Sequence, residues 1–548
     1  MDLGRHRWVD GLLATLGAAF GAVSLTYPFG RDQGLYFYVG REWVLRGAIP
    51  YRDVFDHKTP GIYVVHALCV AIFGETLYGI RIADLLAVLA VGWLAGAFVA
   101  AARNTRGRNG LDRPRAPLRG VGAFVSSVLF FGFLNFIASC EGEVWVALTI
   151  LVALRLVQSE SGGGARPSRA RLVGSGAFAA MALLVKPTAA LLILVVLGVL
   201  VSGSLGSRRS RRSRSLRSAL RTLTGSLVAF AAGAGAILGL TIFYFAWHGA
   251  LRPFQESVLE TNRLYVREGS PIKRPGDLIV HLGLFLEWFQ PFSAVLAAFS
   301  VVGIGRAIVR TDRDATRSYR VGVALVVAAW VGIMLQGKFF QGHWGVMIAG
   351  GALVAVNVAA DGIALFPTRS APWAASLVCT LVLALYARTE RRATDYLVLS
   401  AAAVRFARGQ DSREVYLTHF REFFVAESAG ENEACGNWLR DHTTEADFVA
   451  VRAFQPQVYA IARRRYPGRF FWTGFVYGFA GVHHRDRWLA EDRQALAAHP
   501  PKYVTTFASI HDTSEGPTWW IARGYTKRTT IGDFTILERT PETATVPW

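Results

Sequence analysis

Long apolar runs recur along the chain and constrain its fold more than any other feature. Examples are AALLILVVLGVLVSG from residue 189 and AASLVCTLVLALYA from residue 374. A helix needs ~20 such residues to cross ~30 Å of hydrocarbon. Of the 548 residues, 52% are hydrophobic and only 18% are charged, too few charges to cover a soluble surface of this size. The sequence therefore predicts an α-helical polytopic membrane protein. The first run, 8–26, is too long for a signal-peptide core and is predicted to be a retained span.

Arginine-rich clusters account for the net charge of +20. They fall between apolar runs, at 103–119, 166–171, 208–221 and 306–320. Basic residues in short loops mark the cytoplasmic face of a membrane protein. The clusters therefore indicate topology, and no nucleic-acid partner is expected. Binding of RNA or lipid headgroups by GSRRSRRSRSLRS, from residue 206, remains the alternative for that one stretch.

Placing every basic cluster in the cytoplasm, with a cytoplasmic N-terminus, predicts about eleven spans. They are 8–26, 79–102, 120–137, 143–158, 172–186, 188–204, 222–247, 289–308, 320–337, 343–362 and 372–389. The odd number puts the chain after residue 390 outside the cytoplasm. The predicted domains are a transmembrane domain at 1–390, whose outer loop 28–78 carries the site, and a soluble extracytoplasmic domain at 391–548.

Ionisable residues gather on the predicted outer face, where they suggest a functional cavity because charges at membrane depth are costly. The set is Asp32, Asp53, Asp56, His57, Lys58, Glu141, Glu143, Lys186, Lys338 and His343. Simpler explanations stay open for several members. Asp32 suits a helix cap, Lys58 and Lys186 suit anchors at the interface, and His343 suits an interfacial polar residue.

Two short helices are predicted in the first outer loop, and both are expected to lie at the membrane interface. The stretch 34–47 is amphipathic, and the apolar stretch 62–73 is too short to span. A turn at Thr59–Pro60 would hold Lys58 at the membrane surface. The later outer loop 249–276 is polar and partly helical; it is either a lid or an ordinary connection.

The C-terminal part changes character, because strand-like and helix-like stretches alternate there. DFVAVRA, RFFWTGF, KYVTTFA and DFTILER predict strands, and EACGNWLRDH, PQVYAIARRR and WLAEDRQALAAH predict helices. This alternation is typical of a small α/β domain. No catalytic constellation is visible in it, so we expect it to support acceptor binding or stability.

Several stretches together resemble a known family. They are GRDQGLYFYVGREWVLRGAIPYRDVFDHKTPGIYVVHALCVAIFGE from residue 30, GIRIADLL with Arg81, CEGEVW, VKPT and GKFFQGHWGVMIAG. Over about residues 8–390 the chain resembles GT-C glycosyltransferases, in the superfamily of protein O-mannosyltransferases, lipid A aminoarabinose transferases and Rgt-type bacterial sugar transferases. Gln33 departs from the pattern, since many relatives have a second acidic residue there.

The resemblance implies transfer of a sugar from a polyprenyl phosphate to an acceptor at the outer leaflet. An inverting displacement needs a base for the acceptor hydroxyl and positive charge at the leaving phosphate. Asp32 is the candidate base. Glu143 or Glu141 would share the role of base or orient the acceptor. The candidates for the phosphate are Lys58, Arg81, Lys186, Lys338 and His343, and the further substrate-loop candidates are His57, Asp56 and Asp53.

No cofactor is expected, although the spacing of Asp53 and Asp56 leaves a divalent cation open. A disulfide between Cys140 and Cys435 is a further possibility that lacks a local spacing pattern. The expected partners are the lipid-linked donor, the bilayer and an unidentified glycan, lipid or protein acceptor. The expected location is a bacterial inner membrane. A transporter or flippase of lipid-linked sugars and a catalytically silent scaffold are the alternatives.

Overall fold

The computed structural model describes most of the chain. The described residues are 2–104, 116–134, 136–158, 166–205, 216–269, 276–277, 305, 313–337, 340–367, 370–389, 391–422, 427–452, 454–472, 484–507 and 516–546. Two compact units are present: unit 1 comprises Met1–Thr26, Arg81–Thr241 and Ser270–Ala401, and unit 2 comprises Tyr27–Ile80, Ile242–Gly269 and Ala402–Trp548. Each unit is built from three separate segments of the chain, whereas the sequence predicted two consecutive domains that meet at residue 390. That boundary stays a prediction.

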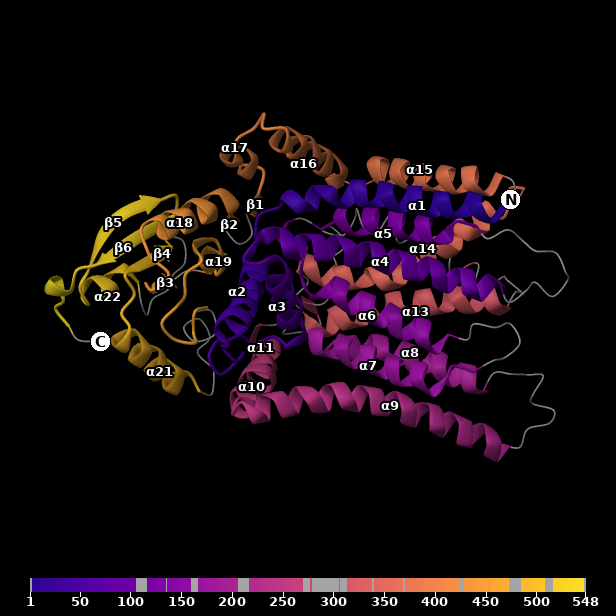
Figure 1. The fold of residues 1–548 in the computed structure, drawn as a ribbon, viewed down its shortest axis with the longest axis horizontal. Coiled ribbons are helices and arrows are strands. Elements are labelled where there is room, and N and C mark those ends of the chain that lie inside the picture. The colour runs from indigo at the N-terminus through magenta and orange to yellow at the C-terminus, as the bar shows by residue number, and fades with distance from the viewer. Residues whose placement is uncertain are drawn as a thin grey trace. The chain divides into compact units, whose positions relative to one another are not determined.

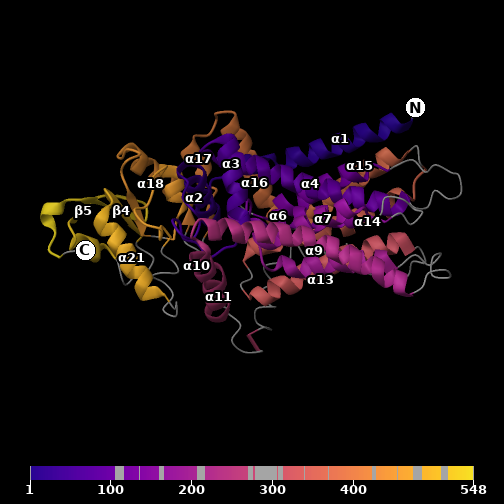
Figure 2. The same cartoon turned by 60° about the horizontal axis from the view of Figure 1, so that its bottom comes forward.

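Unit 1 consists of helices, most of which run side by side in Figure 1, and the rotated view in Figure 2 keeps this alignment. They are α1 (Asp2–Gly21), η1 (Ala22–Thr26), α4 (Leu77–Asn104), α5 (Leu118–Phe131), α6 (Gly142–Val157), α7 (Arg169–Val185), α8 (Ala189–Leu205), α9 (Leu216–Trp247), α13 (Arg313–Gln336), η4 (Gln341–Met347), α14 (Ile348–Ile363), α15 (Ala371–Thr389) and α16 (Arg391–Ala407). Helix α4 begins in unit 2, and α9 and α16 end there.

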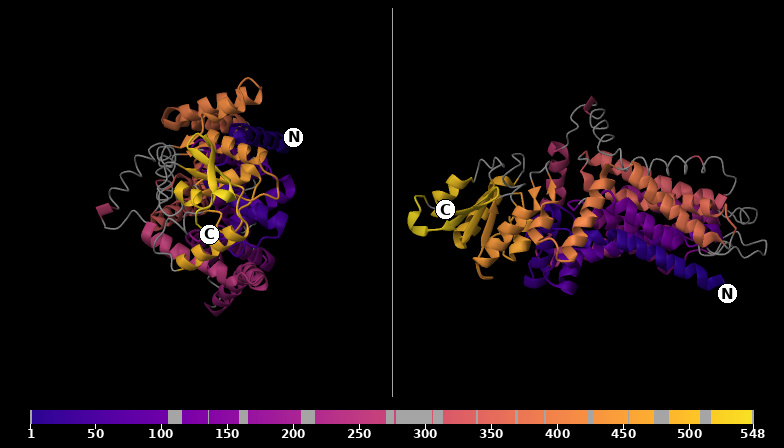
Figure 3. Two further views of the ribbon diagram at one scale, coloured as in Figure 1. Left: turned by 90° about the vertical axis from the view of Figure 1, so that its left-hand side faces the viewer. Right: turned by 90° about the horizontal axis from the view of Figure 1, so that it is seen from above.

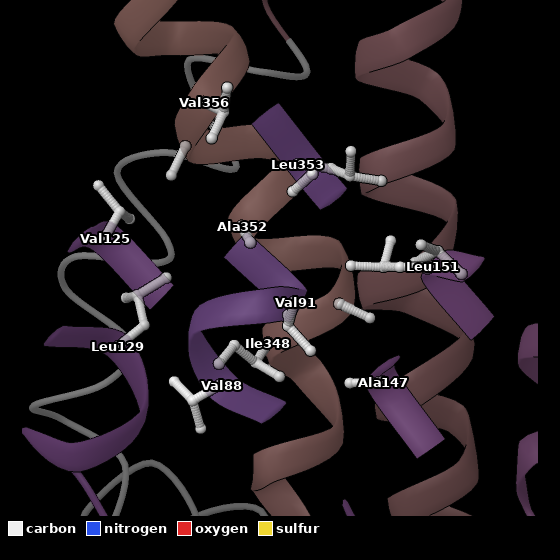
Figure 4. Packing of buried hydrophobic residues seen from close by; sticks show 14 of the residues in the cluster. Val88, Val91, Val125, Leu129, Ala147, Leu151, Ile348, Ala352, Leu353 and Val356 are labelled. Atoms are coloured by element: carbon white, nitrogen blue, oxygen red, sulfur yellow. The ribbon is translucent and has the colours of Figure 1, made fainter. Parts of the chain in front are cut away.

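The core of unit 1 forms where α4, α5, α6 and α14 meet (Figure 4). Its members include Val88, Val91, Val125, Leu129, Ala147, Leu151, Ile348, Ala352, Leu353 and Val356, all buried. Helices in a bilayer associate by close packing, for which small residues at the contact are favourable. Gly92 and Gly122 supply this contact between α4 and α5, because a Cβ atom added to either would lie 2.1 Å from the other's carbonyl oxygen.

The apolar helical architecture is confirmed. Among the described residues, six helices are long and apolar enough to cross a membrane: Arg7–Thr26, Leu77–Arg103, Arg217–Trp247, Arg317–Gln336, Gln341–Ile363 and Ala371–Arg388. Helices α5 to α8 occupy four further predicted spans but have 14, 16, 17 and 17 residues. The predicted span 289–308 lies outside the described residues. The total of about eleven spans and the orientation of the termini stay predictions.

The first segment of unit 2 contains the two short helices of the first loop, α2 (Arg31–Arg46) and α3 (Gly61–Phe73). Helix α2 begins three residues before the predicted stretch because Gln33 caps it: the Gly30 N–H donates to Gln33 Oε1 over 2.7 Å. Such a bond satisfies a backbone donor that the helix itself leaves open. Helix α2 ends at Gly47, whose φ of 66° favours glycine. The interfacial position of both helices stays a prediction.

The remaining segments of unit 2 form short helices and a small sheet; the sheet and the helices after residue 402 are drawn in orange and yellow in Figure 3. The helices are α10 (Leu251–Phe254), the π-helix η3 (Gln255–Glu260), α11 (Thr261–Gly269), α17 (Arg413–Leu417), α18 (Ala429–Asp441), α19 (Gln457–Ala462), α21 (Arg485–Ala498), α22 (Pro517–Ile521) and η7 (Pro541–Thr543). The strands are β1 (Arg421–Glu422), β2 (Glu427–Ser428), β3 (Val449–Arg452), β4 (Tyr503–Phe507), β5 (Tyr525–Ile531) and β6 (Phe534–Arg539).

The main sheet has the order β3-β4-β6-β5, with β3 and β4 parallel and the other neighbours antiparallel. The small C-terminal sheet predicted from the alternating stretches is confirmed. The strand predicted from residue 469 is wrong for residues 469–472, which form no regular element. Phe470, Phe471 and Trp472 are all buried in succession, whereas a strand exposed on one face alternates. Residues 473–475 of that prediction lie outside the described chain.

Helix α2 is tied to α19 within unit 2 by a buried arginine. The fully buried guanidinium of Arg41 donates to the carbonyls of Tyr459 over 3.2 Å and Arg464 over 2.7 Å, and pairs with Glu42. Gly34 permits the close approach of the two helices, since an added Cβ atom would lie 2.3 Å from the Cα atom of Gln457. The first loop and the C-terminal part therefore share one folded unit.

Candidate functional site

The turn between α2 and α3 sets the position of Lys58. An isolated bridge joins Pro50 to Val54, and Tyr51 between them takes a left-handed φ of 71°. The Tyr51 hydroxyl donates to the Lys58 carbonyl over 2.8 Å, and Pro60 then caps α3. This local structure fixes the Lys58 backbone just before a helix, as the Thr59–Pro60 turn predicted.

Lys58 lies among two carboxylates and two aromatic rings. Its Nζ atom is 3.6 Å from Asp32 Oδ1 and 3.9 Å from Asp56 Oδ2. The same ammonium lies 5.0 Å from the ring centre of Tyr36 and 5.6 Å from that of Trp472, distances typical of cation–π contact. We call Asp32, Tyr36, Asp56, His57, Lys58, Tyr63 and Trp472 the Lys58 cluster.

Asp56 is the buried hydrogen-bond acceptor of the Lys58 cluster. Its Oδ1 atom accepts from the His57 backbone N–H over 2.7 Å and contacts His57 Nδ1 at 2.9 Å. Its Oδ2 atom accepts from the Tyr63 hydroxyl over 2.6 Å. Burial alone would raise the pKa of this carboxyl, but the nearby Lys58 charge and the hydrogen bonds from His57 and Tyr63 outweigh it and lower the pKa. Asp56 is therefore ionised at neutral pH.

His57 is held as a neutral imidazole. Burial lowers its pKa, and the opposing effect of Asp56 is smaller. Because ionised Asp56 can only accept, the Nδ1 atom carries the proton and Nε2 is the acceptor of the ring. Trp472 stacks on the imidazole with ring centres 6.0 Å apart, and Tyr265 approaches edge-on at 5.3 Å. The Asn262 side chain donates to the His57 carbonyl, so the polar loop after α9 contributes to this environment.

Asp53 belongs to the turn rather than to the Lys58 cluster. Its carboxylate accepts from the Ile49 backbone N–H over 2.7 Å and pairs with Arg52 at 2.7 Å. Partial burial opposes ionisation of Asp53, but these partners outweigh it and lower the pKa. Within the described part of the chain, no group of three or more His, Cys, Asp and Glu side chains is placed to hold a metal ion. Metal independence stays a prediction.

A second polar group lies in unit 1, around the start of α6. Lys186, in the turn between α7 and α8, donates directly to Glu143. Glu141 is the N-cap residue of α6, and its carboxylate lies against Gly342 of η4. Gly345 of the same element packs on the Glu143 side chain. We call Glu141, Glu143, Lys186 and residues 342–345 the Glu143 cluster; it brings together three predicted outer loops.

The remaining sequence-predicted residues are placed as follows. His343 lies in η4, with its ring centre 5.5 Å from that of Phe340. Lys338 lies outside the described residues. Arg81 is fully buried at the start of α4 and donates to Ser139 over 2.6 Å and to Cys140 over 3.2 Å. Asp84, buried on the same helix, interacts electrostatically with Arg81. No disulfide joins the four cysteines, all within the described residues.

Sequence reasoning missed Tyr36, Tyr63, Asn262 and Trp472. Tyr36 follows Asp32 by one helical turn, a spacing that puts both on one side of α2 and was available as a signal. Tyr63 lies in the first turn of α3. Asn262 and Trp472 come from distant segments of unit 2, so no local pattern links them to Lys58.

No family model and no curated protein matches the sequence. Among solved structures, ArnT from Cupriavidus metallidurans bound to undecaprenyl phosphate is similar, with a TM-score of 0.54, 16% identity and 99% of each chain covered. The chain has the fold of ArnT. The apo state of ArnT gives a TM-score of 0.52, with 15% identity and 100% of each chain covered. The predicted GT-C fold is thereby confirmed.

The likeness to the Archaeoglobus fulgidus oligosaccharyltransferase is weaker. Its TM-score is 0.44, with 13% identity, over 92% of this chain and 69% of the other.

Proposed function

We propose that this protein is a membrane glycosyltransferase that moves a sugar from a polyprenyl phosphate to an acceptor outside the cytoplasm. One observation carries the proposal: the Lys58 ammonium lies 3.6 Å from Asp32 and 3.9 Å from Asp56, in a chain with the fold of a protein solved with undecaprenyl phosphate. The Lys58 ammonium could bind a phosphate, and the neighbouring Asp32 carboxylate could accept a proton. These two groups lie side by side.

Lys58 serves the leaving group in this proposal. Breaking the bond between the anomeric carbon and the phosphate oxygen leaves both bonding electrons, and thus a negative charge, on the lipid phosphate. A fixed cation stabilises that charge as it develops. Since Lys58 is shared between Asp32 and Asp56 before the donor arrives, we expect the phosphate to draw the ammonium away from Asp32.

Asp32 serves the acceptor. Its carboxylate, one-third exposed, accepts the proton of the acceptor hydroxyl while that oxygen attacks the anomeric carbon from the face opposite the phosphate. The product has inverted configuration, and the proton ends on Asp32. Drawing Lys58 toward the phosphate leaves the Asp32 carboxylate less neutralised, so donor binding would prepare the base.

The Glu143 cluster is proposed to orient the acceptor. Glu143 and Glu141 supply carboxylates at the start of α6, and Lys186 supplies the matching cation. Arg81 is assigned a structural part, because its guanidinium holds Ser139 and Cys140 just before these acids. We propose a bacterial inner membrane as the location of the protein.

The deciding experiment is sugar transfer in membranes that carry Asp32→Asn, supplied with a labelled pool of polyprenyl-phosphate sugars. Asp441→Asn is the matched control, because Asp441 is an exposed carboxylate of unit 2. We expect Asp32→Asn to abolish transfer while the lipid donor still binds, and Asp441→Asn to behave as the unmutated protein.

Two results would overturn parts of the proposal. Full activity in Asp32→Asn would remove Asp32 as the base and make Glu143 the leading acid. If the unmutated protein transfers no sugar from any donor in the pool, the transferase assignment fails. Movement of labelled lipid-linked sugar across proteoliposomes would then identify a flippase, and its absence would favour a silent scaffold.

A further inference from the structure

Trp472 lies against the candidate site although it belongs to the C-terminal part of the chain. Its ring stacks on His57 at an interplanar angle of 21°, and the Lys58 ammonium lies 5.6 Å from its centre. Phe454 packs edge-on against it with ring centres 6.4 Å apart. Trp472 is only 8% exposed, so the ring is enclosed by these neighbours rather than offered to solvent.

The backbone leading to Trp472 is fastened to the first loop. The Phe55 N–H donates to the Arg469 carbonyl over 2.8 Å, and the Arg469 guanidinium donates to the Tyr51 carbonyl over 3.0 Å. The rings of Phe55 and Phe470 pack with centres 5.2 Å apart. These contacts attach residues 469–472 to the turn that carries Lys58, so the indole has a defined position relative to the ammonium.

A lysine ammonium requires such lateral support to act as a fixed charge. Its four-carbon stem rotates freely, and a mobile cation loses side-chain entropy when it binds an anion. Tyr36 and Trp472 both lie within cation–π distance of Lys58, and each ring face attracts the cation without neutralising it. The two rings therefore restrict the ammonium to positions near Asp32 and Asp56 while leaving its charge available.

We propose that Trp472 is a positioning residue of the lipid-phosphate site: its indole holds the Lys58 ammonium in place and thereby strengthens binding of the phosphate. This inference rests on the proposed function, in which Lys58 binds that phosphate. It gives the C-terminal part of unit 2 a direct share in the site, where the sequence indicated only a supporting domain.

The test is equilibrium binding of undecaprenyl phosphate to the purified full-length protein, with undecaprenol, which lacks the phosphate, as the reference ligand. We expect Trp472→Leu to weaken undecaprenyl phosphate binding by about tenfold and to leave undecaprenol binding unchanged. Trp472→Phe, which keeps a π face, should stay within about threefold of the unmutated protein. Trp519→Leu is the matched control, because that indole covers Arg523 at 3.7 Å and not Lys58.

Repeating Trp472→Leu in a Lys58→Met background separates the inference from the proposed function. If Trp472 acts through Lys58, it should have no further effect there. An equal loss in both backgrounds, or a loss for undecaprenol as well, would overturn the positioning role. If Lys58→Met weakens binding and Trp472→Leu does not, the inference alone fails; if Lys58→Met changes nothing, the phosphate assignment of the proposed function fails. Should Trp472→Leu not fold, Trp472→Met takes its place, since its flexible side chain adapts to irregular space and has no π face.

Discussion

The two polar clusters both contain a lysine and carboxylates, but they use the lysine differently. In unit 1, Lys186 makes a direct hydrogen bond to one carboxylate, Glu143. In unit 2, Lys58 is shared between Asp32 and Asp56 at 3.6 and 3.9 Å and lies beside two aromatic rings. The two lysine side chains are similarly exposed, 20% for Lys186 and 24% for Lys58, so solvent access does not explain the difference.

Under the proposed function, this contrast separates a lysine that stabilises the fold from a lysine that binds the donor phosphate. A direct, largely buried pair loses much when either partner is removed or diverted, because the other charge is left uncompensated. A cation that makes longer contacts with two carboxylates loses less interaction energy with each of them when it binds an anion. We therefore expect Lys186 to act mainly on stability and Lys58 mainly on transfer.

Replacing the two lysines in turn tests this contrast most strongly. Lys58→Met should reduce sugar transfer by about 10²–10³-fold, the usual effect of removing one group that stabilises a developing charge. Lys186→Met should reduce it less, and Lys527→Met, on the exposed face of β5, should not reduce it. Initial rates at saturating donor measure the effect. Equal losses for Lys58→Met and Lys186→Met would show that the two clusters do not differ in this way.

Changes in the Glu143 cluster should reduce the stability of the protein more than changes at Lys58 do. Glu143→Gln leaves Lys186 without its carboxylate, so we expect a loss of about 1–3 kcal/mol in the free energy of unfolding. The double variant Glu143→Gln, Lys186→Met should recover part of it, because no charge is then left unpaired. Unfolding temperatures in detergent provide the measurement, with Lys58→Met as the comparison. A larger shift for Lys58→Met than for Glu143→Gln would contradict the assignment.

Glu256, a carboxylate outside both clusters, extends the comparison to the pH dependence of stability. Burial of Glu256 in the π-helix opposes its ionisation, but hydrogen bonds from Arg487 and Arg252 and the nearby His484 outweigh this and lower its pKa. His484 also contacts Glu260 at 2.9 Å. A lowered folded-state pKa adds stability that is complete above the ordinary value of 4.5 and is lost as the pH falls through the lowered value.

The corresponding measurement is the unfolding temperature of the unmutated protein and of Glu256→Gln between pH 7 and pH 3. We expect the gap between them to be constant at neutral pH, to begin to narrow below about pH 4.5, and to close as the pH falls through the lowered pKa of Glu256. His484→Asn is the control for any contribution of the imidazole. A gap that does not narrow at all between pH 4.5 and pH 3 would mean that the advantage of Glu256 over glutamine does not come from its ionisation.

The smallest effect concerns Gln33, next to Asp32. Its side chain caps α2 through the Gly30 N–H, so Gln33→Ala should cost about 0.5–1 kcal/mol. Gln33→Glu keeps the acceptor oxygen and should cost less. Unfolding temperatures measure both, and transfer rates provide the second readout. A large loss of transfer in Gln33→Glu without a loss of stability would show that the extra carboxylate disturbs Asp32.

Local sequence signals predicted much of the first loop. The glycines and the amphipathic pattern predicted α2, and the Thr59–Pro60 turn predicted the break before α3. Asp32 and Lys58 were both assigned to the first outer loop, and the Lys58 Nζ and Asp32 Oδ1 atoms lie 3.6 Å apart. Helix α16 was missed because its uncharged stretch between Asp395 and Arg405 is too short to indicate a span, and β5 was missed because Lys527 and Arg528 mask the alternation.

Local sequence patterns could not predict the contacts between residues that are far apart in the chain. Nothing near Lys58 in the sequence indicates Trp472, since the two meet only after unit 2 has assembled. Lys186 and Glu143 were each predicted as outer-face residues, but their direct pairing depends on how the α7–α8 turn packs against the start of α6. Arg81 was assigned to a phosphate from its motif, yet its contacts with Ser139 and Cys140 follow from burial, which the motif does not reveal.

The discontinuous composition of unit 2 has a consequence for biogenesis. Its three segments, Tyr27–Ile80, Ile242–Gly269 and Ala402–Trp548, leave the ribosome at widely separated times. At ~5–20 residues per second, roughly 20 to 80 s pass between synthesis of Lys58 and of Trp472. During that interval the first loop has emerged without its eventual neighbours. A chain arrested before Trp472 would carry Asp32, Asp56 and Lys58 without the indole that lies beside Lys58, so we expect the proposed site to assemble only after residue 472 has been synthesised.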